Sequence, residues 1–237
     1  MIQIVFSIKK LLKEGVHDYM LDYELIKKLY GIGEMQGCLP EDMNYLKEKY
    51  QTIPEQLRIF FETAGGTTEL NKVQDEWLFP DKYRMYTWMD KEIYKDYFVL
   101  LNENQGVFQV VIKRTDMSMD NPPVYVMDET NIVGKCADTL TEFLMGMLIY
   151  QSVFDMKYSP EDFFWYTDEE MQVIRKTMIM MPYKLHNWYS DTIEFYSNAE
   201  DNMLYVMDDG NQGTYGAMTS LSYQKIEEIL GEMGKEQ

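Results

Sequence analysis

Cysteine and histidine are scarce in this sequence, which has two of each among 237 residues. Disulfide-stabilised secreted domains use many more cysteines for their length, so Cys38 and Cys136 are expected to be free thiols in a reducing compartment. Metal centres draw on clustered ligands, and His17 and His186 belong to no H-E-x-x-H pattern. We therefore expect no metal and no cofactor. A Gly-x-Ser-x-Gly nucleophile elbow is missing as well, so we expect no esterase-type catalytic site.

Long apolar runs and basic residues are equally scarce. No run approaches the roughly 20 residues that span a bilayer, and the apolar start of the chain is too short for a signal peptide. These features predict a cytoplasmic protein without a membrane partner. The chain has 22 basic and 40 acidic residues and a formal net charge of −18. Nucleic-acid affinity comes largely from Lys and Arg, so nucleic acid is excluded as a partner, whereas a basic protein would be attracted.

The sequence is rich in core-forming residues, with 46% hydrophobic and 14% aromatic side chains. Apolar periodicity and capping signals predict helices at 18–30, 40–50, 54–63, from Thr139, from Thr167 towards Met180 with Pro182 ending it, and from Ser220 to Leu230. Strands are predicted at 97–101, 107–113, 123–127, 192–197, 203–207 and 214–218, and residues 67–96 are expected to be irregular with one strand. Tight hairpin turns are predicted at Asn104-Gln-Gly106 and at Asp208-Asp-Gly-Asn211. Because the strands cluster in runs, the pattern indicates an α+β fold, a mainly antiparallel twisted sheet with helices packed on it.

One segment of the sequence is echoed later in the chain. Val124-Tyr-Val-Met-Asp-Glu resembles Leu204-Tyr-Val-Met-Asp-Asp at an offset of 80 residues, and each copy precedes an apolar helix. The match is short, so coincidence and internal duplication both remain open.

An acidic stretch rich in aromatic residues follows the helix that begins at Thr139. Four consecutive aromatic residues, Phe163 to Tyr166, stand among carboxylates. Aromatic anchors surrounded by charges of one sign are typical of a surface that binds an oppositely charged protein. The candidate partner-binding residues are therefore Asp162, Trp165, Asp168, Glu169 and Glu170. The alternative is that the acids only stabilise a helix N-terminus and that Trp165 fills the core.

Four segments follow one another along the chain: PEQLRIFFETAGG at 54–66, YFVLLNENQGV at 97–107, NPPVYV at 121–126 and ADTLTEFL at 137–144. Their order and spacing resemble the SMI1/KNR4 (SUKH) superfamily, in its bacterial immunity-protein-like branch. The resemblance covers about residues 40–154 of one α+β domain over 1–237, and residues 155–237 match loosely as a C-terminal strand-and-helix extension. Within the core, residues 67–96 have few positions that align.

The resemblance implies a non-catalytic protein that binds and neutralises a cognate toxin, often a nuclease. A basic toxin domain would suit the acidic charge of this chain. One alternative is an intracellular regulatory or scaffold protein that binds a signalling or cell-envelope partner, as fungal relatives suggest. Another is a hydrolase with a carboxylate pair, which residue types alone leave open. The toxin's identity and the oligomeric state stay open at this point.

Overall fold

The structure, a computed structural model, describes residues 21–72, 75–129, 131–160 and 162–233. The helices in this part of the chain are α2 (Tyr23–Tyr30), α3 (Pro40–Tyr50), α4 (Glu55–Ala64), α5 (Pro80–Met85), α6 (Leu140–Asp155), α7 (Asp168–Thr177) and α8 (Ser220–Met233). Short 3₁₀ turns lie at Thr68–Asn71, Trp88–Asp90, Glu92–Tyr94 and Arg114–Asp116.

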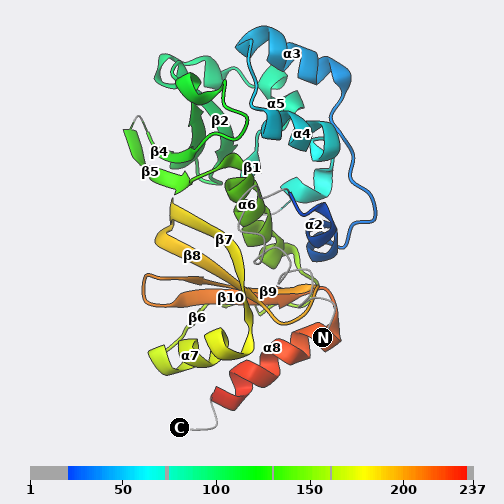
Figure 1. The fold of residues 1–237 in the computed structure, drawn as a ribbon, viewed down its shortest axis with the longest axis vertical. Coiled ribbons are helices and arrows are strands. Elements are labelled where there is room, and N and C mark those ends of the chain that lie inside the picture. Colours follow the sequence, from blue (N-terminus) through cyan, green and yellow to red (C-terminus); the bar gives the residue numbers. More distant parts are fainter. Residues whose placement is uncertain (1–20, 73–74, 130, 161, 234–237) are drawn as a thin grey trace.

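The strands form two antiparallel five-stranded sheets. Sheet A contains β1 (Glu76–Trp77), β2 (Tyr97–Asn102), β3 (Phe108–Lys113), β4 (Val124–Asp128) and β5 (Asn131–Ala137), in the order β1-β2-β3-β4-β5. Sheet B contains β6 (Phe164–Trp165), β7 (Ile179–Trp188), β8 (Ser190–Ser197), β9 (Asn202–Met207) and β10 (Gln212–Ala217), in the order β6-β10-β9-β8-β7. The predicted α+β class with helices on antiparallel sheet is confirmed, and Figure 1 shows α6 between the two sheets.

Three strands were missed by the sequence prediction: β5, β7 and the two-residue β6. Strand β5 lies where only a loop was expected, because Gly134 and Lys135 interrupt its apolar alternation. Strand β7 replaces the predicted end of the helix that begins after Thr167: the helix stops at Thr177, and Pro182 lies inside the strand. A proline is tolerated there because β7 is at the edge of sheet B and its pairing with β8 is irregular between Met180 and Lys184.

Two helix starts also differ from the prediction. Asp18 lies outside the described residues, and the residue that caps α2 is Asp22, whose carboxylate accepts the Leu25 N–H at 2.9 Å. At the other end of α2, Gly31 has a φ of 63°, as a left-handed C-cap requires. Helix α8 is capped by Thr219 rather than Ser220, since the Thr219 hydroxyl accepts the Ser222 N–H at 3.3 Å.

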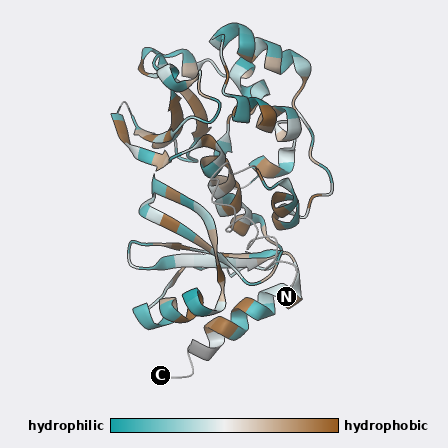
Figure 2. Cartoon of the chain, viewed as in Figure 1, coloured by the Kyte–Doolittle hydropathy of each residue, from teal (hydrophilic) through white to brown (hydrophobic). Residues whose placement is uncertain are grey.

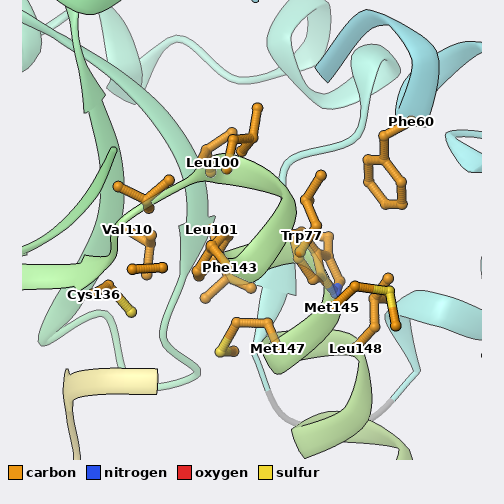
Figure 3. Close-up of a cluster of buried hydrophobic side chains, with 14 of the residues drawn as sticks. Phe60, Trp77, Leu100, Leu101, Val110, Cys136, Phe143, Met145, Met147 and Leu148 are labelled. Atoms are coloured by element: carbon orange, nitrogen blue, oxygen red, sulfur yellow. The ribbon is translucent and has the colours of Figure 1, made fainter. Parts of the chain in front are cut away.

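Helix α6 is the centre of the main hydrophobic core. Nearly every residue from Leu140 to Val153 is buried, because α6 contacts α2, α4 and β5 on one side and β7, β9 and β10 on the other. Trp77 of β1 packs between Phe143 of α6 and Phe60 of α4, with ring centroids 5.8 and 5.9 Å away (Figure 3). A helix that is apolar all round therefore unites the two sheets.

Sheet B is covered on both faces. In β9, Met203 and Tyr205 belong to the main core, whereas Leu204 and Val206 belong to a second cluster under α7 and α8. This alternation is what period-two side-chain geometry requires of a strand buried on both faces. Helices α7 and α8 have an open outer side, and Figure 2 shows hydrophilic and hydrophobic residues alternating along α8.

The two halves repeat the same order of elements, β2-β3-β4-β5-α6 and β7-β8-β9-β10-α8. The echoed segments form the third strand of each unit, β4 and β9. The pair Met127 and Ile132 in the first hairpin corresponds, 80 residues later, to the pair Met207 and Gln212 in the second.

The caps agree at the same offset. Thr139 accepts the Glu142 N–H at 3.2 Å, as Thr219 accepts the N–H of Ser222. The two units have the same strand order, and their hairpin register and helix cap share one offset of 80 residues. This agreement favours duplication over coincidence.

The two sheets meet where β5 lies against β7. The Asn187 amide donates to the Lys135 carbonyl at 2.9 Å, and the Asn187 side chain occupies the space that a Cβ on Gly134 would fill. Gly134 is therefore needed for close approach at this junction. We call the line of contact between β5 and β7 the seam.

Candidate partner-binding surface

The five predicted contact residues lie at the far edge of sheet B: Asp162 just before β6, Trp165 on β6, and the other three at the start of α7. Trp165 is 69% exposed, so the alternative in which it fills the core is wrong. Its neighbours Phe163 and Phe164 are less exposed, because their rings contact Tyr205 and Tyr215 respectively. Trp165 is therefore the most exposed of these three aromatic residues, and an exposed tryptophan is a suitable anchor for a protein partner.

The four carboxylates have different roles. Glu170 completes a capping box with Thr167, accepting the Thr167 N–H at 2.7 Å while the Thr167 hydroxyl accepts the Glu170 N–H. For Glu170, the structural alternative is therefore correct. Asp168 accepts a hydrogen bond from the Asn211 amide at 3.4 Å, and Asp162 and Glu169 are exposed. Glu161, in the same acidic stretch, lies outside the described residues.

The turn between β9 and β10 extends this surface. Gly210 and Asn211 adopt φ values of 72° and 51°, as predicted for a hairpin turn made from Asp208-Asp-Gly-Asn211. Trp165 lies beside Gly210, and the Tyr166 N–H donates to the Asn211 carbonyl at 3.1 Å. The turn also carries the exposed Asp209, the residue before Gly210.

A groove of about 730 Å³ continues from this turn to the seam. Its lining includes Phe108, Val133, Tyr189, Asp191, Asp208 and Asp209. These residues come from strand starts and turns at one end of both units, because the first and third turns of an antiparallel meander lie at the same end. The sequence predicts Asp208 and Asp209 only as turn residues, and no local pattern in it indicates a role for Tyr189 or Asp191.

Asp208 joins two of the turns. Burial raises the pKa of its carboxyl, but hydrogen bonds from the Ser190 hydroxyl and the Thr192 N–H outweigh burial and lower that pKa below its ordinary value. Asp208 is therefore charged at neutral pH and has a structural role. Asp191 and Asp209 form no ion pair within the described residues, so their charges are available to a partner.

Beneath Tyr189 lie two buried carboxyl groups, Asp75 at 2% and Glu103 at 4% exposure. The Tyr189 hydroxyl is 3.4 Å from the Asp75 carboxylate and 3.2 Å from that of Glu103. Glu103 also accepts the Gln105 and Val107 N–H groups, which fixes the β2–β3 turn. Burial, helped by the charge of Glu103, raises the pKa of Asp75 to about 7 although the Asn104 N–H opposes it.

The cysteines and the described histidine form no catalytic arrangement with one another. Burial raises the pKa of the Cys136 thiol to about 12 and that of Cys38 to about 11, so both are protonated at neutral pH. The His186 ring is 3.2 Å from the Thr192 hydroxyl, whereas His17 lies outside the described residues. In the part of the chain that the structure describes, no three His, Cys, Asp or Glu side chains are grouped to hold a metal ion.

None of the described helices combines the length and apolar character needed to cross a membrane. Comparisons of the chain with protein-family models, with curated proteins and with solved structures found no match.

Proposed function

We propose that this protein is a non-catalytic immunity-type protein that acts in the cytoplasm and neutralises a basic toxin domain by covering its active face. The family resemblance of residues 40–154 is the reason for proposing a toxin as the partner. The observation that carries the binding role is the exposed Trp165, which stands among carboxylates in the sequence. A large ring left in water on an edge strand loses hydrophobic stabilisation unless something covers it.

The charge of the surface indicates the chemistry of the partner. Asp162, Asp168 and Glu169 lie within four residues of Trp165 in the sequence and are exposed, and the turn that contains the exposed Asp209 lies beside Trp165 at Gly210. Carboxylates around an aromatic anchor suit a partner rich in Lys and Arg, such as a nuclease whose substrate groove is positive. The net charge of −18 would also accelerate the encounter of the two proteins.

Capture followed by rescue tests this proposal. The protein would be used to isolate partners from its native strain, and each captured protein would be expressed alone and together with it. We expect a captured protein of basic charge whose toxicity disappears on co-expression. A partner that is not toxic, or a toxic one that is not relieved, would contradict the proposal.

A pair of variants makes the test specific to the surface. Trp165→Ala combined with Glu169→Lys should abolish rescue, because it removes the anchor and reverses a neighbouring exposed charge. The matched control is Ile93→Ala combined with Glu92→Lys, which also changes an exposed apolar residue and an exposed acid, outside this surface. Rescue retained by both variants would remove this surface from consideration.

A further inference from the structure

The groove at the seam has a chemical character of its own, apart from the Trp165 surface. Tyr189 is 44% exposed there, with Asp191 and Asp209 beside it. Its backbone φ of 58° lies in the left-handed region, which is uncommon for a bulky residue and costs conformational energy. The surrounding structure therefore keeps Tyr189 at the groove although its own backbone conformation is unfavourable.

The carboxyl pair behind Tyr189 lacks a cation. Within the described residues neither Asp75 nor Glu103 forms an ion pair, and one Asp75 oxygen has no hydrogen-bond partner. Buried acids are normally matched by a positive group, because desolvation disfavours the unpaired charged form. The single hydroxyl proton of Tyr189 can satisfy only one of the two carboxylates at a time.

Asp75 and Glu103 hold the Tyr189 hydroxyl but do not line the groove, so the unpaired acids that a ligand reaches there are Asp191 and Asp209. A guanidinium group suits these two acids and the Tyr189 ring. It stacks on a tyrosine face, it pairs with carboxylates in a planar fork, and it is less strongly hydrated than an ammonium group. We propose that the groove binds an arginine side chain projecting from the basic partner, with Tyr189 as the stacking surface and Asp191 and Asp209 as the paired carboxylates. This inference rests on the proposed function for the origin of the arginine, but its chemistry can be tested without the toxin.

The test uses a capped hexa-arginine peptide as the probe and a hexa-lysine peptide of equal charge as its control. Binding to the full chain would be followed by amide chemical-shift changes at low salt. We expect the arginine peptide to bind about fivefold more tightly than the lysine peptide, with the largest shifts at residues 187–191 and 208–210. Equal affinities, or shifts spread evenly over the acidic surface, would overturn the proposal.

Variants separate the groove from general charge attraction. Asp191→Asn with Asp209→Asn should weaken arginine-peptide binding about fivefold more than Glu48→Gln with Asp120→Asn, which removes the same charge at exposed sites outside the groove. Tyr189→Leu should abolish the preference for arginine over lysine, with a thermal melt confirming that the variant folds. An equal loss in the two double variants would overturn the proposal.

The peptide result and the toxin result are distinguishable. A groove that selects arginine while no toxic partner is captured would support this inference and contradict the proposed function. A captured toxin that is neutralised equally well by Asp191→Asn with Asp209→Asn would support the proposed function and overturn the placement of its arginine in the groove.

Discussion

The two halves of the molecule repeat one unit but bury it differently. Helix α6, which closes the first unit, is enclosed by both sheets, whereas α8, which closes the second, covers one face of sheet B and leaves an outer side in water. The same order of elements thus provides a shared core helix in one copy and a peripheral helix in the other. The amino-acid composition of α6 and of α8 therefore follows the burial of each helix in the molecule more than the repeated topology.

The difference extends to the turns. In the first unit the β2–β3 turn is fixed from within by the buried Glu103, whereas the equivalent β7–β8 turn of the second unit presents Tyr189, which is 44% exposed, at the groove. The acids that line the groove, Asp191, Asp208 and Asp209, all come from the second unit.

The largest expected difference between the halves concerns their cores. Phe60→Ala should lower the free energy of unfolding by about 3–5 kcal/mol, because it opens a cavity against Trp77 in the main core. Ile226→Ala in α8 should cost about 2–3 kcal/mol, since its cluster is smaller. Denaturant titration of both variants provides the measurement, and a Phe60→Ala value near zero would contradict the burial of α4.

The buried carboxyl at the seam should give the next largest effect. An unfolded aspartate titrates near 3.9, whereas Asp75 in the folded protein titrates at about 7. Between these values the folded state holds the extra proton, so stability should fall as the pH rises from about 4 to 7, in total by about 2–4 kcal/mol. Asp75→Asn should remove this slope in pH-dependent melts, while Asp120→Asn should keep it.

The two equivalent caps offer a test of smaller size. Thr139→Ala and Thr219→Ala should each cost about 1 kcal/mol, because each removes the hydroxyl that accepts an N–H in the first turn of its helix. Thermal melts compare the two variants directly. A loss at Thr139 with none at Thr219 would show that the caps are not equivalent in the two units.

The smallest effect separates two neighbouring acids at the start of α7. Glu170→Lys should cost about 1 kcal/mol, because it breaks the capping box, whereas Glu169→Lys should change stability by less than about 0.5 kcal/mol. Equal losses would mean that Glu169 is also structural and would weaken its assignment to the binding surface.

Local signals explain which elements could be predicted from the sequence. The turns at Asn104-Gln-Gly106 and Asp208-Asp-Gly-Asn211 and the capping box at Thr167 identified their hairpins and helix, because the required conformations depend on neighbouring residues. Strands β5 and β7 were missed because their sequences break the alternation, and β6 was missed because two residues are too few to show one. Tertiary contacts decide the state of all three.

The same reasoning applies to the candidate site. Trp165 and the neighbouring carboxylates lie close together in the sequence, so the sequence alone could identify them as a candidate surface. Asp75, Glu103 and Tyr189 come from three distant segments, and only the fold brings them together. The 80-residue offset between the echoed segments was the one sequence signal that could have aligned the two units. Such an alignment would have placed their equivalent turns at the same end of the molecule.

The most direct test of the binding account is amide hydrogen exchange on the full chain, free and in complex with its captured partner. The account predicts new protection at residues 162–170 and at the turns 187–191 and 208–211, with little change in α3 and α5. Protection confined to α3 and α5, or no protection at β6 and these turns, would contradict it.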